Sequence, residues 1–446
     1  MRGWTPFYDS WLSFATAAML LGEGSPRLAT PALNDAVHPA SFAARAVPSP
    51  RPLGNRTMQT AISVGSDVGS MSLPTFSDTR PALGTPTDEL ETPTVVADLD
   101  AIDRNLRDIA HLADDAGVGV RPHTKAHKIP ALARQQEDLY GPGVLCQKLS
   151  EAEVMVRTGV RDVMLVCPVV SGPKLERLLW VADHADRFAT LVDCPGNVRP
   201  LADVAARKGT TVGVIIEVDV GVERMGVAPG EGASELAALI AEESALEFRG
   251  ILGHDSHVPA AGKTVEGYER ECAGVADKLE RTVEGIEAEG FPVETVISGA
   301  SSTARYMARE PVVTELDPGR YVFNDATLLA ARPEIDREDC ALTVLTTVIS
   351  KPTRDRAIVD AGGKTLSYIA DPKPVPKYRD DIEFYRVSSE HGFLDVADAS
   401  DVSVGDRLEF VVPNAYGPIN LHDTLPGIRD NRVEEVWNVS ARGKDT

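Results

Sequence analysis

Residues 211–219 read TVGVIIEVD, and this run decides how the middle of the chain is interpreted. It is apolar without interruption from Val212 to Ile216 and ends in two carboxylates, Glu217 and Asp219. Strands of this kind are typical of a parallel sheet whose two faces are both covered. We therefore expect a buried parallel strand here, with polar side chains at its carboxyl end.

Similar short apolar runs occur along the chain on both sides of this one, separated by amphipathic segments. The recurring strand-then-helix order predicts parallel βα units, and the number of units predicts a (β/α)8 TIM barrel of the α/β class. A doubly wound open sheet is the alternative, but no GxGxxG sequence follows any of these strands. The other predicted strands lie at 117–122, 143–147, 162–168, 188–193, 248–253, 294–299 and near 313–319.

The two ends of the chain differ from this middle part. Residues 1–85 are rich in Ala, Pro, Ser, Gly and Thr without periodicity, which predicts a flexible N-terminal extension. Residues 86–335 hold the barrel units. After residue 336, short strand-like runs are joined by Gly, Pro and Asp turns, so 336–446 is predicted to be a smaller all-β domain.

Composition excludes several classes of function. The chain has 446 residues and a formal charge of −22, and its acidic surface argues against nucleic acid as a partner. No apolar run is long enough to span a membrane. The five cysteines are odd in number and form no CxxC pair, so we expect neither a disulfide framework nor a zinc ribbon, but a reducing, cytoplasmic location.

Polar residues at the carboxyl ends of barrel strands are the candidates for chemistry. RPHTKAHK (121–128) follows the first predicted strand. Lys125 in this segment can be desolvated, which lowers the pKa of its amine and makes the amine nucleophilic toward an aldehyde. The alternative is a solvated surface lysine. His123 and His127 would ligate a metal only if the segment were helical, and the prolines on either side of it argue against a helix.

SGASST (298–303) offers small residues, hydroxyls and backbone N–H groups between a strand and a helix. This is a phosphate cradle in chemical terms, although most turns of this composition bind nothing. A reactive lysine and a phosphate cradle on one barrel together suggest pyridoxal 5′-phosphate as the cofactor.

Five segments together resemble one known family, that of D-threonine aldolase and eukaryotic-type D-serine dehydratase. These are fold-type III pyridoxal phosphate enzymes related to alanine racemase. The resemblance implies a barrel followed by a β domain, usually in a homodimer with the active site near the interface, and an amino acid as substrate. The segments are RPHTKAHK (121–128), QKLSEAE (147–153), EVDVGVERMG (217–226), DAGGKTLS (360–367) and SSEHG (388–392).

The resemblance also implies roles for individual residues. Lys125 would bind the cofactor covalently, and Gln147 and Arg224 would line the pocket. Asp317 falls where alanine racemases place an arginine opposite the pyridine nitrogen, although it is equally well explained as a turn residue before Pro318. The phosphate turn would consist of Ser298, Gly299, Ala300, Ser301 and Ser302.

One segment departs from the family. In the relatives, a P-x-H-x-C/D-P-x-x-N-L segment supplies a divalent metal that engages the substrate's β-hydroxyl. Here PNAYGPINLHD (413–423) has Ala415 and Gly417 at the two ligand positions, so we expect no metal. A side-chain acid or base must then act instead; His391 is the first candidate, with a purely structural histidine equally open, and Tyr416 is another.

The sequence thus predicts a pyridoxal phosphate lyase acting on D-3-hydroxy amino acids, without a metal. The alternative is an amino-acid racemase or epimerase in which Lys125 serves one face of Cα and Tyr416 or His391 the other. A non-catalytic pyridoxal phosphate carrier is a third interpretation, disfavoured by the β domain. The sequence does not fix the substrate side chain or the choice between Cα–Cβ and Cα–H cleavage.

Overall fold

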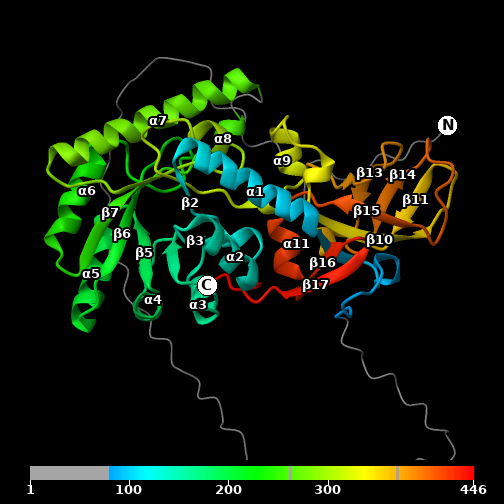
Figure 1. The fold of residues 1–446 in the computed structure, drawn as a ribbon, viewed down its shortest axis with the longest axis horizontal. Coiled ribbons are helices and arrows are strands. Elements are labelled where there is room, and N and C mark those ends of the chain that lie inside the picture. The colour runs from blue at the N-terminus through cyan, green and yellow to red at the C-terminus, as the bar shows by residue number, and fades with distance from the viewer. Residues whose placement is uncertain (1–79, 261–263, 368–370) are drawn as a thin grey trace, which may run out of the picture. The chain divides into compact units, whose positions relative to one another are not determined.

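The computed structural model describes residues 80–260, 264–367 and 371–446. The predicted N-terminal extension, 1–85, therefore lies almost wholly outside the described residues. Within them the chain forms two sheets, one curled into a barrel with helices around it and one mainly antiparallel (Figure 1).

The first sheet is an eight-stranded barrel, as predicted. Its strands are all parallel and run in the order β2-β9-β8-β7-β6-β5-β4-β3. A bridge between His123 and Leu145 joins its two edges, supported by a hydrogen bond of 2.9 Å from the Leu145 N–H to the Pro122 carbonyl. The strands are β2 (Gly119–Val120), β3 (Val144–Cys146), β4 (Asp162–Leu165), β5 (Arg187–Val192), β6 (Val212–Glu217), β7 (Leu246–Leu252), β8 (Thr295–Ile297) and β9 (Glu315–Leu316).

The TVGVIIEVD run forms β6, and each of its six strand residues is buried. It pairs with β5 on one side and β7 on the other, which explains its uninterrupted apolar character. Glu217 is the last residue of β6 and therefore lies at the carboxyl end of the barrel, where TIM-barrel active sites form.

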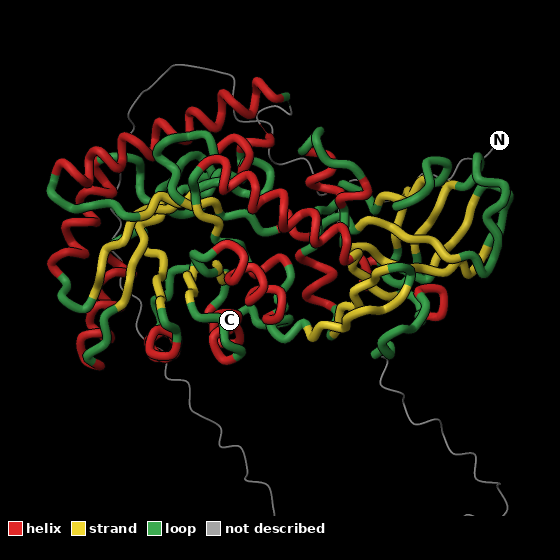
Figure 2. Tube along the Cα trace, in the orientation of Figure 1, coloured by secondary structure: helices red, strands yellow, loops and turns green. Residues whose placement is uncertain are grey.

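Helices alternate with these strands in sequence, and they lie around the outside of the curled sheet (Figure 2). Helix α1 begins where the Asp98 side chain accepts a hydrogen bond from the Ala101 N–H, and it ends at Gly117, whose φ of 71° favours glycine. The helices are α1 (Leu99–Ala116), α2 (Pro130–Tyr140), α3 (Leu149–Arg157), α4 (Gly172–His184), α5 (Pro195–Lys208), α6 (Glu231–Glu242), α7 (Val265–Ala288), α8 (Ala304–Met307) and α9 (Ala326–Ala331).

The second sheet contains the predicted C-terminal strands and one strand from the other end of the chain. β1 (Thr94–Asp98) pairs antiparallel with β10 and parallel with β16. Residues 94–98 were expected in the barrel part, but their pairing places them in this sheet. Its other strands are β10 (Leu342–Ser350), β11 (Arg356–Val359), β12 (Val375–Pro376), β13 (Glu383–Val387), β14 (Gly392–Asp395), β15 (Arg407–Val411), β16 (Thr424–Arg429) and β17 (Arg432–Asn438), accompanied by helices α10 (Gly363–Leu366) and α11 (Tyr416–Leu421).

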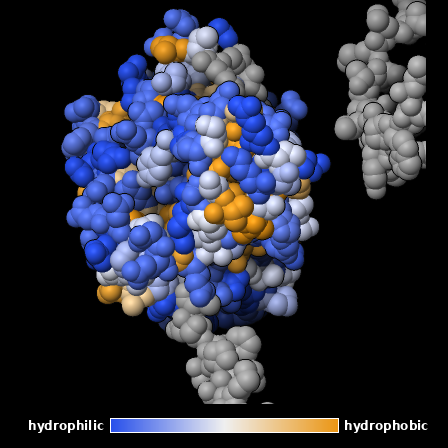
Figure 3. All heavy atoms as spheres, turned by 90° about the vertical axis from the view of Figure 1, so that its right-hand side faces the viewer, coloured by the Kyte–Doolittle hydropathy of each residue, from blue (hydrophilic) through white to orange (hydrophobic). Residues whose placement is uncertain are grey.

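The surface agrees with the acidic composition. Seen from the side of the second sheet, it is mostly hydrophilic, with several scattered hydrophobic spots and one more continuous hydrophobic patch near the centre (Figure 3). No helix in the described part of the chain combines the length and the apolar character needed to cross a bilayer. All five cysteines are free thiols.

A buried ion-pair cluster links three barrel strands. Arg121, which is 3% exposed, donates from Nε to Glu315 at the start of β9, at 2.7 Å, and from Nη1 to Asp162 at the start of β4, at 2.8 Å. Removing the arginine would leave the largely buried Glu315 without a counter-charge and Asp162 with only the exposed Arg187, 3.7 Å away.

We therefore predict that Arg121→Ala lowers the free energy of unfolding, measured by urea denaturation, by about 3–5 kcal/mol. Arg309→Ala is the matched control, because Arg309 is 64% exposed and its partner Glu269 is 54% exposed, so their ion pair lies at the surface; that loss should stay below about 1 kcal/mol. Equal losses in the two variants would show that the Arg121 cluster is not what holds these strands together.

Candidate active site

The candidate site is built around η2 (Thr124–Ala126), a single 3-10 turn that follows β2 at the carboxyl end of the barrel. Thr124 anchors this turn: its buried hydroxyl lies 2.9 Å from Glu151 Oε1 and 3.0 Å from the Leu145 carbonyl. Glu151 also accepts the Gln147 N–H at 3.1 Å, so β3, α3 and η2 are tied together. Lys125, the next residue, is held in place by these bonds.

The Lys125 amine borders a cavity but is closely surrounded by protein. Burial lowers the pKa of Lys125 to about 8, although the negative charge of Asp317 opposes this shift. Nζ donates to Gln147 Oε1 at 3.1 Å, and Gln147 in turn donates to the Val166 carbonyl at 3.0 Å. At mildly alkaline pH much of this lysine is therefore neutral, the form that a nucleophilic role requires.

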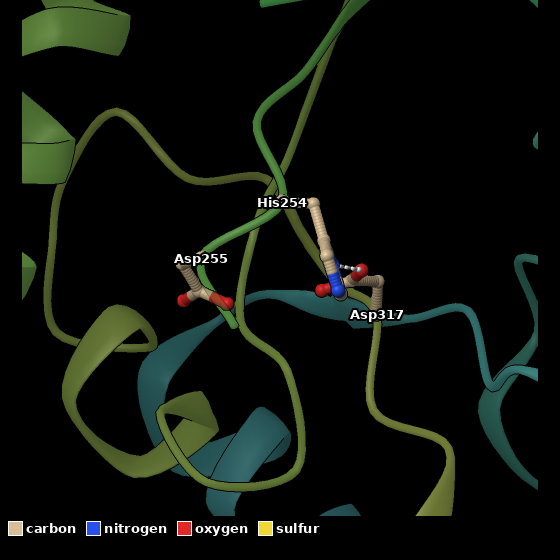
Figure 4. Close-up of side chains that lie close together, drawn as sticks. All are labelled: His254, Asp255 and Asp317. Atoms are coloured by element: carbon tan, nitrogen blue, oxygen red, sulfur yellow. Dashed lines mark hydrogen bonds and ion pairs between the residues drawn. The ribbon is translucent and has the colours of Figure 1, made fainter. Parts of the chain in front are cut away.

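Asp317 and His254 lie side by side (Figure 4), and both line the two cavities that Lys125 borders. His254 Nδ1 lies 3.1 Å from Asp317 Oδ2, whereas Asp317 Oδ1 is buried without a hydrogen-bond partner. Asp317 is 4% exposed. A buried carboxylate oxygen that lacks a partner has room for one donor from a ligand.

Asp255 completes a small acidic cluster with these two side chains. Ligand atoms of His254, Asp255 and Asp317 lie within 4.8 Å of one another, close enough to surround a cation. However, Asp255 Oδ1 already accepts the Ala300 N–H at 3.0 Å, and burial raises the pKa of Asp255. Its hydrogen bond makes Asp255 a support for the 298–303 turn.

The SGASST turn presents unused backbone donors. The N–H groups of Ser301 and Ser302 make no hydrogen bond to any described residue. Gly299 has a φ of 123°, and a Cβ there would lie 2.6 Å from Leu316 Cδ2, so only glycine fits. Ser298 instead donates to the Gly253 carbonyl at 2.7 Å, and the Ser301 hydroxyl accepts the Gly319 N–H at 2.9 Å, so these two hydroxyls are structural.

Two adjoining cavities meet at Lys125. One has a volume of about 170 Å³ and extends from Lys125 past Asp317 to the SGASST turn and Tyr416. The other, within the barrel mouth, is bordered by Gln147, Glu217 and Arg224. A larger cavity of about 450 Å³ lies on the far side of Ser301 and Ser302, but neither Lys125 nor Asp317 reaches it.

Glu217 and Arg224 form an ion pair at this mouth, with Arg224 Nη2 3.1 Å from Glu217 Oε1. Glu217 is 2% exposed, and burial raises its pKa to about 7. The pair positions the Arg224 guanidinium at the edge of the cavity that Lys125 enters.

Tyr416, at the start of α11, brings the second sheet's part of the chain to the site. Lys125 Nζ lies 5.7 Å, and the Arg320 guanidinium carbon 5.5 Å, from the centre of its ring. Burial raises the pKa of Tyr416, and Arg320 opposes the rise. Arg320 is fixed by the fully buried Asp325 at 3.2 Å. Sequence reasoning missed this arginine, although it follows the Asp317 turn directly.

The structure does not bring His391 to these cavities. His391 is exposed in the turn between β13 and β14 and lines neither cavity. Its neighbour Glu390 pairs with Lys364, so the SSEHG and DAGGKTLS segments lie against each other.

The two histidines of RPHTKAHK do not converge on a common point. His127 donates from Nε2 to Gln136 at 3.0 Å and accepts the Ile129 N–H at Nδ1, also at 3.0 Å, which uses both ring nitrogens. Burial lowers the pKa of His127 to about 4, so it is neutral. His123 instead borders the cavity.

Comparison with known proteins identifies both parts of the chain. Residues 97–326 match the family model of the alanine racemase N-terminal domain, and residues 341–428 match that of the putative serine dehydratase domain. A 3-hydroxy-D-aspartate aldolase of Paracoccus denitrificans is 34% identical over 82% of this chain and 95% of its own.

Solved structures agree with this. The crystal structure of D-threonine aldolase from Filomicrobium marinum has a TM-score of 0.78 and 34% identity, covering 82% of this chain and all of that one. D-threo-3-hydroxyaspartate dehydratase from Delftia sp. HT23 has a TM-score of 0.72 and 25% identity, covering 79% and 98%. That dehydratase has also been solved as a cysteine-to-alanine variant in a metal-free form.

The lowered pKa of Lys125 gives a test of the site. We predict that the rate at which the cofactor-free protein binds pyridoxal phosphate covalently rises with pH and levels off above an apparent pKa near 8, since the neutral amine is the nucleophile. Growth of the visible absorbance band of the lysine-bound cofactor measures this rate. An exposed lysine would keep gaining rate up to about pH 10, and such a profile would contradict the buried site.

Proposed function

The chain belongs to the alanine racemase-like family of pyridoxal phosphate enzymes that contains D-threonine aldolases and D-serine dehydratases, and from this premise we propose that it is a lyase acting on D-configured 3-hydroxy amino acids. The observation that carries the proposal is the partly desolvated Lys125, which faces Asp317 within one cavity that also contains the unused N–H groups of the SGASST turn.

The residues at this site suit the cofactor. The free N–H groups of Ser301 and Ser302 would hold its phosphate, and the unpartnered Asp317 Oδ1 would accept a hydrogen bond from the protonated pyridine nitrogen. Gln147 and Arg224 border the lysine from the barrel mouth. When bound, pyridoxal phosphate supplies the electron sink for bond breaking at Cα.

Lys125 has two tasks. Its Nζ would hold the cofactor covalently, and when a substrate amine takes that place, the freed Nζ, whose pKa burial lowers to about 8, would serve as a base near neutral pH. Gln147 Oε1 keeps the amine directed toward the cavity.

Tyr416 is the second proton-transferring group. The raised pKa keeps its phenol protonated at neutral pH, so it donates a hydrogen bond to a substrate oxygen or releases its proton to a leaving hydroxide. Arg320 stabilises the phenolate that remains after that release.

The first experiment identifies the bond that breaks. Full-length protein loaded with pyridoxal phosphate is incubated with D- and L-forms of 3-hydroxyaspartate, threonine and serine. We expect an aldehyde product for Cα–Cβ cleavage or ammonia for dehydration, from D-forms only. Lys125→Ala should lose the lysine-bound absorbance band and about 10⁴-fold or more in kcat.

A racemase is the second candidate, favoured by the presence of Lys125 and Tyr416 in one cavity. It predicts loss of optical activity with no aldehyde or ammonia released. That outcome would replace the lyase proposal.

The role of Tyr416 has its own test. Tyr416→Phe should lower kcat by about 10²–10⁴-fold with little change in KM, because the hydroxyl acts in the transition state and the ring is retained. Tyr385→Phe, on the second sheet and outside both cavities, is the matched control. A Tyr416→Phe enzyme with unchanged kcat would remove Tyr416 from the mechanism.

His391 lines neither cavity, so we propose a catalytic role for it only across the interface of the predicted homodimer. Mixing Lys125→Ala with His391→Ala protein would then give heterodimers with one complete site, and about a quarter of wild-type activity should return after random exchange. If no activity returns, His391 has no catalytic role across the interface.

The free cysteines favour the predicted cytoplasmic location.

A further inference from the structure

The PNAYGPINLHD segment (413–423) leads into and forms α11, which starts at Tyr416 and thus adjoins the site. Ala415 precedes the helix and is fully buried, and its N–H donates to Asp325 Oδ2 at 3.0 Å. The same Asp325 carboxylate holds Arg320. The segment is therefore fixed by hydrogen bonds at the first of the two positions where relatives place a metal ligand.

The second position, Gly417, is blocked by another side chain. A Cβ at Gly417 would lie 2.2 Å from Ser367 Oγ and 2.3 Å from Ser367 Cβ. Both distances are far below van der Waals contact. Ser367 itself has a φ of 48°, a left-handed conformation that seldom occurs in serine. Its side chain thus fills the space that a ligand at 417 would need.

Two other side chains of the segment that could bind a metal, those of His422 and Asp423, contact other residues. His422 Nε2 lies 3.3 Å from the Thr365 carbonyl, so this nitrogen carries a proton and has no free lone pair. Burial lowers the pKa of His422, which is therefore neutral. Asp423 is paired with Arg442. The 365–367 turn consequently contacts α11 at both of its ends.

We propose that this segment is a latch rather than a metal centre: Ser367 occupies the volume of the second ligand, and the contacts of Thr365 and Ser367 with α11 hold Tyr416 beside Lys125. The hydroxyl chemistry of the substrate then depends on side chains. Only the statement about the substrate's hydroxyl rests on the proposed function. The occupation of the second ligand position by Ser367 does not depend on it.

Metal binding tests, without any substrate, whether Ser367 blocks a metal ligand at position 417. Ala415→His/Gly417→Cys restores the ligand pair, and adding Ser367→Gly opens the space while suiting the left-handed backbone. After EDTA treatment, exposure to Zn²⁺ or Mn²⁺ and dialysis, metal content is measured by mass spectrometry. We expect none above background in wild type and the double variant, and about one equivalent in the triple variant.

Stoichiometric metal in the wild type or the double variant would overturn the proposal. So would a triple variant that binds no more than the double variant, because Ser367 would then not be the obstacle.

Thermal stability gives a second, independent measurement. Gly417→Ala should lower Tm by roughly 2 to 5 °C, because its methyl group overlaps Ser367, and Ser367→Gly should remove that loss in the double variant. If Gly417→Ala is equally harmful with and without Ser367, the two side-chain positions do not compete and the proposal fails.

The activity measurement separates this inference from the proposed function. If lyase activity is found, EDTA should leave kcat unchanged, and strict dependence on added Mn²⁺ or Zn²⁺ would overturn the latch while sparing the lyase. Absence of lyase activity would overturn the proposed function, and the metal and stability measurements would still decide the latch.

Discussion

Exclusion of water from the Lys125 amine is the constraint on which the site depends. An amine with an ordinary pKa would be protonated at neutral pH and would neither bind an aldehyde nor accept a proton. Burial lowers the pKa of Lys125 to about 8, and the negative charge of Asp317 limits this lowering. The bonds of Thr124 to Glu151 and Leu145 keep the short turn in place, so the lysine cannot swing out to solvent.

The same barrel end divides its polar groups by task. Backbone N–H groups of the SGASST turn suit an anion, the Asp317 carboxylate suits a positively charged nitrogen, and Tyr416 beside Arg320 suits an oxygen that gains or loses a proton. Each group is held by a residue that does no chemistry itself: Asp255 supports Ala300, His254 supports Asp317, and Asp325 supports Arg320. Preorganisation of this kind is what makes charged groups effective in catalysis.

The barrel could be predicted from sequence because continuous apolar strands such as β6 carry a strong signal, and Lys125 because barrel sites follow strand ends. Three features could not. The pairing of β1 with β10 and β16 depends on contacts remote in sequence. Nothing in the local sequence distinguishes Arg320 from a surface arginine, because its contacts with Asp325 and Tyr416 are formed only in the folded structure. The Ser367 side chain occupies the space beside Gly417, and nothing in the local sequence of the DAGGKTLS and PNAYGPINLHD segments indicates that they meet there. His391 was chosen from a motif, and the fold leaves it outside the cavities of its own chain.

The position of β1 makes the barrel an insertion within the β domain. The strand at residues 94–98 finds both of its neighbours, β10 and β16, only after the whole barrel has been synthesised. Until then it is an unpaired edge of the kind that invites association with other chains. Once paired, it closes a loop that contains every barrel strand, so the β domain cannot be cut away as a separate piece without losing this strand. The halves of the enzyme that carry Lys125 and Tyr416 are thereby interleaved in the chain itself.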